Sequence, residues 1–434
     1  MVPNTTDSIF ARASGQGRAA IAVLRLSGPA IIEVLAKILP QMPPARRAQL
    51  LPVRGQDGEI LDQALVLFMP GPASFTGEDC AELHVHGGHA VVAAVSRALI
   101  DAGARPAEPG EFTKRAFLNR RMDLLEAEGI ADLISAQTEA QRRQALRQMQ
   151  GAQTAVLAAW CERLVGLLAA QEALIDFPDE DLPPEVEAKF LRELGALRAE
   201  MDQARIGTKA AMRVREGITI AVAGPPNVGK STLINALVAR DVAITSAIPG
   251  TTRDALEIAV EIAGVPVTLI DTAGLRETID EIEAEGVRRA RARAENADLV
   301  LWVRGLGDAA DHTEVPPANA ILIANKIDLG GEVKPDEITL SARESIGLEA
   351  LHDLIFERVR ALTELAAGLV LTQDRHHAAL SHAIESLDRA LNANLPELRG
   401  EDLRLATAAL GRISGVVDVE DVLDAIFSRF CIGK

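Results

Sequence analysis

Short apolar runs separated by turn residues make up the first part of the chain, to about residue 118. The runs at 20–26, 64–69 and 81–86 are strand-like, and a helix-like run follows at 89–104. Gly and Pro turn signals separate these runs from one another. The pattern predicts a mixed α/β domain over residues 1–118.

Apolar residues then recur at helical spacing over 119–216, in stretches rich in Ala, Leu, Glu, Gln and Arg. Thr138 and Gln141 have the spacing of a capping box, which opens a helical run that we expect to continue to about Ile175. The loop at 176–184 interrupts the pattern, and a second helical run follows it. We therefore expect a helical domain to begin in this part of the chain.

At Gly217 the pattern changes to strand-like runs that alternate with helical ones: ITIAVA, VPVTLID, ADLVLWV and AILIAN. This alternation is typical of a parallel α/β sheet. Beyond residue 362 three helices are expected, at about 372–393, 396–413 and 418–429. The simplest architecture is a helical domain over 119–216 and 363–434, into which an α/β domain, 217–362, is inserted.

Composition narrows the function classes. Of 434 residues, 48% are hydrophobic, which excludes disorder as the dominant state. The 62 acidic residues outnumber 45 Lys and Arg, so the net charge of -17 excludes a general nucleic-acid coat. Aromatic residues are only 3%, which argues against a surface that stacks bases. Any RNA contact must therefore use a local basic patch.

Targeting and redox signals are weak. The N-terminus has no basic segment followed by an apolar one, and no 18-residue window is apolar and uncharged. The three cysteines, Cys80, Cys161 and Cys431, are far apart and form no CxxC pair. We expect a soluble cytoplasmic protein without a zinc or disulfide framework.

The strongest motif is GPPNVGKS at 224–231, which fits a phosphate-binding loop between a strand and a helix. Its glycines leave backbone N–H groups free to surround a β-phosphate. Lys230 would reach the β- and γ-oxygens, and the Ser231 hydroxyl would bind Mg²⁺. The order of strand, loop and helix makes a chance glycine-rich turn a poor explanation.

Four further motifs follow in the order that a GTPase needs. Thr252, in GTTRD, would sense the γ-phosphate through Mg²⁺. Asp271 begins DTAG behind the metal, and the Gly274 amide would face the γ-phosphate. Asp328, in NKID, would accept from guanine N1–H and its 2-amino group, which adenine lacks. Ser341 and Ala342 fit the last base-contacting loop, so the set predicts a GTP site.

The position after DTAG is Leu275, where Ras-like proteins place a glutamine that orients water. Leucine cannot orient water, so hydrolysis must be arranged differently. Asn227 offers an amide oxygen in the phosphate loop, where it either holds a monovalent cation or is merely structural. The residues alone leave these two readings open.

The chain resembles the MnmE (TrmE) family of tRNA-modifying GTPases over essentially all 434 residues. The segments that carry the resemblance include VLRLSGPA, PGPASFTGEDCAELHVHGGH, RPAEPGEFTKRAFLNRRMDLLEAEGIADLI, DTAGLRETIDEIEAEGVRRA and the terminal IFSRFCIGK. No fold rule requires the last of these. The resemblance implies an N-terminal α/β domain that binds folate and dimerises, a helical domain and an inserted Ras-like G domain.

The resemblance also implies the function. Family members are potassium-activated GTPases that form homodimers and, with a FAD-dependent partner of the MnmG (GidA) family, heterotetramers. Together they place a 5-carboxymethylaminomethyl or aminomethyl group on the wobble uridine, U34, of certain tRNAs. The one-carbon unit comes from 5-formyltetrahydrofolate or 5,10-methylenetetrahydrofolate, and no membrane is involved.

The family pattern assigns roles to individual positions. Magnesium contacts fall on Ser231 and Thr252, and potassium contacts on Asn227, Ser246, Ile248 and Thr251. The catalytic glutamate falls on Glu283, whose alternative is a solvated charge in an acidic run. The residues expected to contact GTP are Asn227, Val228, Gly229, Lys230, Ser231, Thr232, Ser246, Ala247, Ile248, Pro249, Gly250, Thr251, Thr252, Asp271, Thr272, Ala273, Gly274, Asn325, Lys326, Asp328, Ser341 and Ala342.

Folate contacts fall on Arg25, Glu82, Arg121 and Lys434. Glu82 would accept from the amino-pyrimidine edge of a pterin, and the basic residues suit the carboxylates of folate. The family commonly has Lys where this chain has Arg121, so a role in charge survives but a role as a point donor would change. The alternative is that these are ordinary surface charges.

Other features allow more than one reading. His84, His86 and His89 resemble a metal site, but a structural or pocket-wall role fits better because no cysteine or acidic set completes one. Basic residues at 114–121, with Arg142, Arg143 and Arg147, either contact tRNA or form ordinary helix surface. Cys431 is either a functional thiol near the folate site or a packed apolar residue.

Two rival functions remain at this point. A ribosome-assembly GTPase of the Era or Der type also has Asn in the phosphate loop, but such proteins carry KH-type RNA-binding domains. A folate-binding housekeeping protein with an incidental switch domain would not need complete G motifs.

Overall fold

The computed structural model describes residues 7–176, 184–240, 242–243, 257–272, 295–306, 316–317, 319–364, 371–415, 423, 426–427, 430 and 433. The chain divides into two compact units. The first contains residues 1–131, 148–161 and 408–434, and the second contains residues 132–147 and 162–407.

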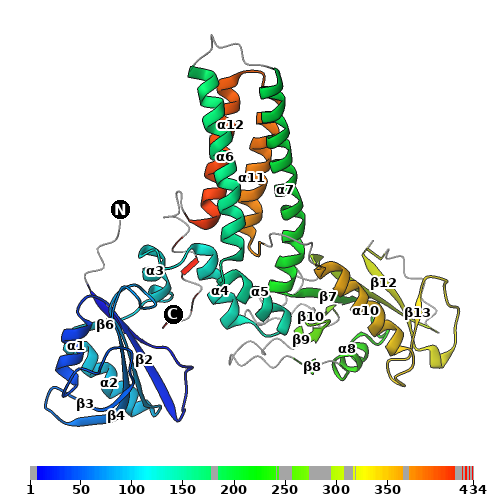
Figure 1. Ribbon diagram of the computed structural model, residues 1–434. Helices are drawn as coiled ribbons and strands as arrows, with labels where there is room; N and C mark the ends of the chain where they lie inside the picture. The colour runs from blue at the N-terminus through cyan, green and yellow to red at the C-terminus, as the bar shows by residue number, and fades with distance from the viewer. Residues whose placement is uncertain are drawn as a thin grey trace, which may run out of the picture. The chain divides into compact units, whose positions relative to one another are not determined.

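The first unit is built on a mixed sheet in the order β3-β4-β5-β2-β1-β6. Helices α1 and α2 pack together against this sheet (Figure 1). The elements are β1 (Ser8–Arg12), β2 (Ile21–Ser27), α1 (Ile31–Ile38), β3 (Gln49–Arg54), β4 (Ile60–Met69), β5 (Cys80–His86), α2 (His89–Ala102), β6 (Ala104–Pro106), α3 (Glu111–Leu118) and α4 (Leu124–Ser135).

Alternation along β2 explains how this sheet divides its two faces. Ala22, Leu24 and Leu26 are buried in the core that contains the apolar side of α1. Successive side chains of a strand point to opposite faces, so Val23 and Arg25 lie on the other face. The sequence therefore predicted the central strands well, whereas the short elements α1, β1 and β3 gave no clear signal.

Residues from the C-terminal part of the chain pack within the first unit. Phe427 and Phe430 are buried in one cluster with Leu124 and Ala127 of α4. The ring centroids of Phe427 and Phe430 lie 5.5 Å apart. A Cβ on Gly110, which has φ 68°, would lie 2.5 Å from the carbonyl oxygen of Phe427. The backbone before α3 and the C-terminal segment are thus in direct contact.

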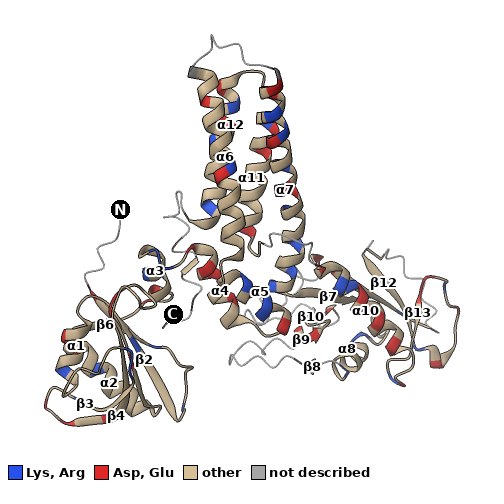
Figure 2. Cartoon of the chain, in the orientation of Figure 1, with Lys and Arg blue, Asp and Glu red and all other residues tan. Residues whose placement is uncertain are grey.

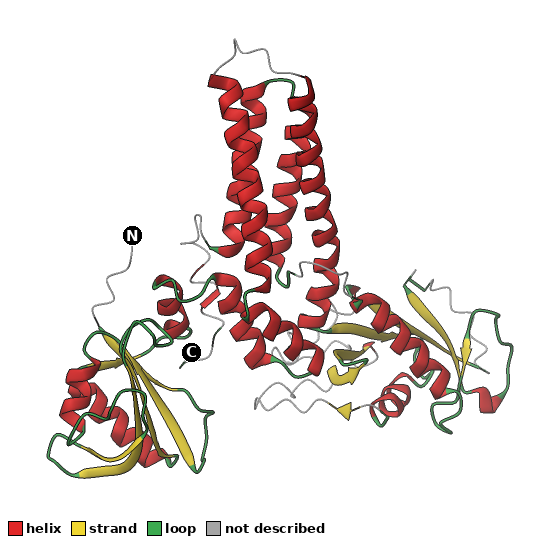
Figure 3. Cartoon of the chain, viewed as in Figure 1, coloured by secondary structure: helices red, strands yellow, loops and turns green. Residues whose placement is uncertain are grey.

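The second unit contains α7 (Pro184–Glu216) and α11 (Asp374–Asn392), and most of α5 (Glu139–Met149), α6 (Ala152–Asp176) and α12 (Pro396–Ser414). Helices α6, α7, α11 and α12 run side by side as an all-helical bundle (Figure 3). Acidic and basic residues both occur along this bundle (Figure 2). Arg163 pairs with Glu200 between α6 and α7, and Arg198 pairs with Asp388 between α7 and α11.

The predicted capping box is confirmed at the start of α5. Gln141 N donates to Thr138 Oγ1 at 3.4 Å, and Thr138 N donates to Gln141 Oε1 at 3.2 Å. The expectation of a single helix from Thr138 to Ile175 is wrong. The helix is interrupted at Gly151, which has φ 75°. The left-handed conformation is the one that glycine accepts most readily.

Among the described helices, one passes a test of length and composition for crossing a membrane. It is Ala152–Ile175 in α6, with a window of mean hydropathy 1.2, although we expected no such segment. One such helix is weak evidence, because core helices also pass. Leu157, Trp160, Leu164 and Leu167 of this helix are buried within the protein.

The second sheet has the order β13-β12-β11-β7-β10-β9-β8. Strands β7, β10, β11, β12 and β13 are parallel, as predicted, but β9 and β8 add an antiparallel edge that we did not expect. The elements are β7 (Ile218–Ala223), α8 (Lys230–Val238), β8 (Val242–Ala243), β9 (Glu257–Ile262), β10 (Val265–Asp271), β11 (Leu299–Gly305), β12 (Ala320–Asn325), the 3₁₀ turn η2 (Ile327–Leu329), β13 (Ile338–Thr339) and α10 (Leu348–Thr363).

Candidate functional site: a nucleotide site and a basic N-terminal site

The loop between β7 and α8 contains glycines that no other residue could replace without strain. Gly224 has φ 138°, and a Cβ there would lie 2.0 Å from Val303 O. Gly229 has φ 94°, and a Cβ there would lie 2.5 Å from Asn325 Nδ2. Both glycines therefore let the loop pass close to neighbouring strands. The phosphate loop predicted from the motif is present in its required context.

Lys230 is the first residue of α8 and is buried. Its Nζ donates to Gly224 O and Pro225 O, both at 2.7 Å. The ammonium group is thus directed into the phosphate loop, at the amino end of a helix where anions are favoured. Asn227 is exposed in the same loop, with a left-handed φ of 64°.

A hydroxyl and a carboxylate meet beside this loop. Ser231 Oγ donates to Asp271 Oδ2 at 2.6 Å, and Asp271 is the last residue of β10. Thr272 Oγ1 donates to Val222 O at 2.8 Å, which fixes the end of β10 against β7. Hydroxyl and carboxylate oxygens are the ligands that Mg²⁺ prefers. This donor set fits the magnesium ion that the motif predicts.

The base-recognition motif is tied to the phosphate loop by one side chain. Asn325 Nδ2 donates to Val228 O at 2.8 Å, and its Oδ1 accepts from the N–H groups of Lys326 and Ala342, at 2.8 and 3.0 Å. Asp328 lies in the next turn with an exposed side chain. The NKID motif indicates that Asn325 is near the nucleotide but not that it has this role, because nothing in the neighbouring sequence indicates a bond to Val228.

The structure therefore brings together most of the described nucleotide residues. Asn325 bonds to Val228 and Ala342, and Ser231 bonds to Asp271. Lys230 and Thr272 bond to backbone carbonyls of the phosphate loop and of β7, and Thr232 is exposed on α8. Ser341 is buried, next to Ala342. The remaining predicted positions lie outside the described residues: Ser246, Ala247, Ile248, Pro249, Gly250, Thr251, Thr252, Ala273, Gly274, Leu275 and Glu283.

In the first unit, Arg25 and Glu82 face each other across β2 and β5. Arg25 Nε and Nη2 donate to Glu82 Oε1 at 3.0 and 2.9 Å. His84 Nε2 lies 3.3 Å from Glu82 Oε2. The Arg25 guanidinium also lies over the Phe75 ring, 5.5 Å from its centroid. The two residues expected from the family pattern are thus in contact, and Phe75 joins them.

Arg121 and the C-terminal segment reach the same part of the unit. A Cβ on Gly77, two residues after Phe75, would lie 3.2 Å from Arg121 Cγ. A Cβ on Gly433 would lie 2.6 Å from Arg12 O. Arg12 pairs with Leu24, the neighbour of Arg25 on β2. Cys431 and Lys434 themselves lie outside the described residues.

Two of the three histidines bond to carboxylates, His84 to Glu82 and His86 to Asp62. His86 Nδ1 hydrogen-bonds with Asp62 Oδ1 at 2.7 Å, and the backbone N–H of His86 donates to the other oxygen of that carboxylate. In the part of the chain that the structure describes, no group of three or more metal-ligating side chains occurs.

The chain matches two protein families and is similar over its whole length to curated proteins. Residues 8–121 match the family described as GTP-binding protein TrmE N-terminus, and residues 124–431 match the MnmE helical domain. The chain is 53% identical to the tRNA modification GTPase MnmE of Gluconacetobacter diazotrophicus, with 100% of each chain covered. It is 52% identical to the same enzyme of Granulibacter bethesdensis, with 99% of each chain covered.

Proposed function

The chain belongs to the MnmE family of tRNA modification GTPases, which hydrolyse GTP as part of tRNA modification. We propose that this hydrolysis serves the modification of the wobble uridine. With a FAD-dependent partner of the MnmG (GidA) type, the protein forms the 5-carboxymethylaminomethyl or aminomethyl group of U34 in certain tRNAs. A tetrahydrofolate, 5-formyl or 5,10-methylene, supplies the one-carbon unit. The protein works in the cytoplasm as a homodimer, within a heterotetramer that includes the partner.

One observation carries the nucleotide part of this proposal. Asn325 joins the phosphate loop, through Val228 O, to the loop that holds Ala342, and leaves Asp328 exposed beside them. An exposed carboxylate at this place accepts from guanine, whereas adenine offers no donors to it. The base and the phosphates would therefore be read by one connected structure.

The metal assignments extend the same site. Ser231 and Thr252 hold Mg²⁺, which neutralises charge on the β- and γ-phosphates. Asn227, Ser246, Ile248 and Thr251 hold K⁺, which supplies the positive charge that an arginine supplies in other GTPases. Glu283 acts on the attacking water through a second water, since Leu275 cannot orient it. Asn227 is exposed in the phosphate loop, which supports its assignment as a potassium ligand.

The modification itself is tested in cells. A deletion strain should lack the modified wobble nucleoside by mass analysis, and the wild-type gene should restore it. A Lys230→Ala gene should not, because the ammonium group directed into the phosphate loop is lost. The deletion strain could instead have the same level of unmodified U34 as the parent strain and accumulate immature ribosomal subunits. That result would favour a ribosome-assembly GTPase.

The folate site is proposed at Arg25, Glu82, Arg121 and Lys434. Glu82 has a carboxylate oxygen beside His84 that can accept from a pterin, and Phe75 adds a flat apolar surface next to Arg25. Arg121 provides a cation for folate carboxylates. The described residues of this set therefore fit a ligand that is planar at one end and anionic at the other.

The dimer is proposed to form through the sheet of the first unit. Leu50 and Leu65 pair across β3 and β4 and are 65% and 41% exposed. Ile21 and Ile60, on β2 and β4, are 58% and 49% exposed. The cross-strand pair of exposed leucines is the kind of apolar surface that protein interfaces cover.

Deletion of residues 431–434 tests the folate site. Loss of Lys434 removes a charged contact, so 5-formyltetrahydrofolate should bind about 10- to 100-fold more weakly by calorimetric titration. Potassium-stimulated GTP hydrolysis should stay nearly unchanged, because the nucleotide residues belong to the other compact unit. Unchanged folate affinity would show that Lys434 does not contribute to folate binding.

A further inference from the structure

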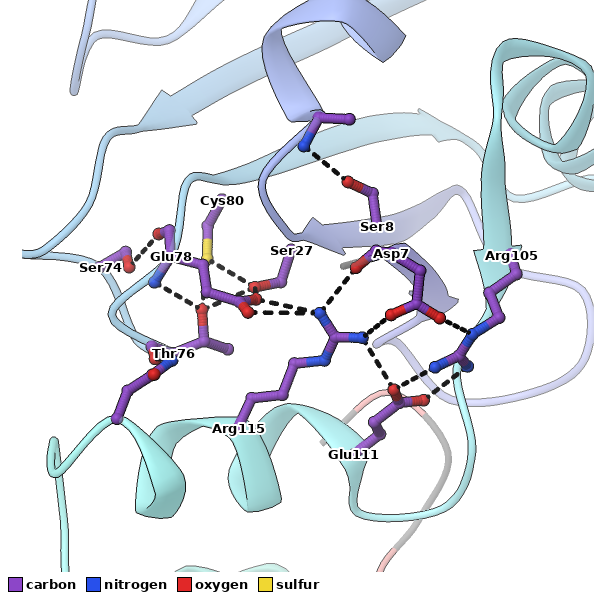
Figure 4. Close-up of polar contacts among 12 residues, drawn as sticks. Asp7, Ser8, Ser27, Ser74, Thr76, Glu78, Cys80, Arg105, Glu111 and Arg115 are labelled. Atoms are coloured by element: carbon purple, nitrogen blue, oxygen red, sulfur yellow. Dashed lines mark hydrogen bonds and ion pairs between the residues drawn. The ribbon is translucent and has the colours of Figure 1, made fainter. Parts of the chain in front are cut away.

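A buried guanidinium connects α3 to the loop 70–79, which joins β4 and β5 (Figure 4). Only 1% of the Arg115 side chain is exposed. Its Nη1 donates to Asp7 O and to both carboxylate oxygens of Glu78, and its Nη2 donates to Asp7 Oδ1 and Glu111 Oε1, at 2.9–3.3 Å. A buried charge is costly unless it is paired in this way, so this network demands a fixed geometry from its members.

Glu78 extends the network into the loop. Its Oε2 accepts from Ser27 Oγ at 2.7 Å, and Ser27 Oγ hydrogen-bonds with Thr76 Oγ1 at 2.6 Å. Thr76 Oγ1 also accepts from the Glu78 N–H at 3.2 Å. Thr76 is fully buried, and its hydroxyl lies 3.2 Å from Cys80 Sγ. One hydroxyl therefore fixes the loop against both β2 and β5.

The residues on either side of Thr76 belong to the proposed folate site. Phe75 lies beneath the guanidinium of Arg25, and Gly77 lies against the stem of Arg121. Ser27, the partner of Thr76, is two residues from Arg25 on β2 and shares its face. Asn119 Nδ2 donates to Thr76 O at 2.7 Å, which fixes the backbone between the two site residues.

We propose that Thr76, Glu78 and Arg115 are positioning residues, which hold Phe75 and Gly77 where a reduced folate can lie against Arg25 and Arg121. The inference rests on the proposed folate function. None of the three residues needs to touch the ligand. Their effect on binding comes from a loop that is ordered before the ligand arrives, which reduces the entropy lost on binding.

Two substitutions of Thr76 separate positioning from stability. Thr76→Ser keeps the hydroxyl but loses a buried methyl group, whereas Thr76→Val keeps the shape but loses the hydroxyl. We expect Thr76→Val to weaken 5-formyltetrahydrofolate binding about 10-fold in calorimetric titration and Thr76→Ser to change it less than about 3-fold. Without ligand, hydrogen exchange in residues 71–80 should accelerate in the Val variant only.

Glu78→Gln and Glu111→Gln form a second matched pair, because both carboxylates accept from Arg115 but only Glu78 reaches Ser27. Glu78→Gln should weaken binding more than Glu111→Gln. Equal folate affinity in the Ser and Val variants, with equal exchange in 71–80, would overturn the inference. A wild-type protein that binds no folate would refute the proposed folate site, and the exchange data alone would then decide on positioning.

Discussion

Replacing Asn325 by Ala should disconnect base recognition from phosphate binding. Asn325 is 3% exposed, and its side chain makes three hydrogen bonds, to Val228 O and to the N–H groups of Lys326 and Ala342. Each bond contributes about 1 kcal/mol net, and a partner left buried without water costs more. Val228 and Ala342 are both buried. The expected loss of stability is therefore about 3–5 kcal/mol in this domain.

Two measurements check this value. Thermal unfolding should show a lower midpoint, and titration with a fluorescent GDP analogue should show affinity reduced about 100-fold or more. Asn319→Ala is the matched control, because Asn319 is exposed just before the same strand and donates to Ala297 O and Asp298 O. It should have little effect on either measurement. If both variants behaved alike, the connection through Asn325 would contribute nothing and the reasoning would be refuted.

Three other predictions follow from the same two units. GTP turnover in potassium should exceed turnover in sodium by at least about 10-fold, and Asn227→Ala should remove the difference while nucleotide still binds; equal wild-type rates would contradict the cation model. Asp328→Asn should weaken GTP binding and favour xanthosine triphosphate, and equal competition by ATP in the wild type would contradict the guanine assignment. Burial raises the pKa of Glu111, but hydrogen bonds from Arg105, the Glu108 N–H and Arg115 outweigh it, so the folded-state pKa is lowered from its ordinary 4.5. The stability it contributes is present above pH 4.5 and is lost as pH falls through the lowered value, so Glu111→Gln should reduce the dependence of unfolding on pH in that acid range.

The parts that the sequence predicted are those specified by neighbouring residues. The phosphate loop needs only 224–231, and the capping box only Thr138 and Gln141, so short patterns were sufficient. Strand β9 was missed because its sequence, EIAVEI, has only Val260 and Ile262 buried. A half-exposed strand gives a weaker apolar signal than the buried strands beside it.

The contacts that organise the sites were beyond reach for a different reason. Asn325 and Val228 are 97 residues apart, and Ser27 and Thr76 are 49 apart. An asparagine amide or a threonine hydroxyl in a motif does not indicate with which distant carbonyl or hydroxyl it will form a hydrogen bond. Family resemblance named Arg25 and Glu82, but the contact of Arg25 with Phe75 in the loop before β5 became evident only from the geometry.

The junction between α7 and β7 limits how a change at the nucleotide can spread within the second unit. Asp298 accepts from Arg213 of α7 at 2.8 Å and from the backbone N–H of Thr219 in β7 at 3.1 Å. Gln141 Nε2 of α5 donates to Arg215 O at the end of α7 at 2.8 Å. The strand that leads into the phosphate loop is therefore bonded to the helix that precedes it. Any displacement of β7 that the nucleotide causes must either carry α7 with it or break the contacts of Asp298.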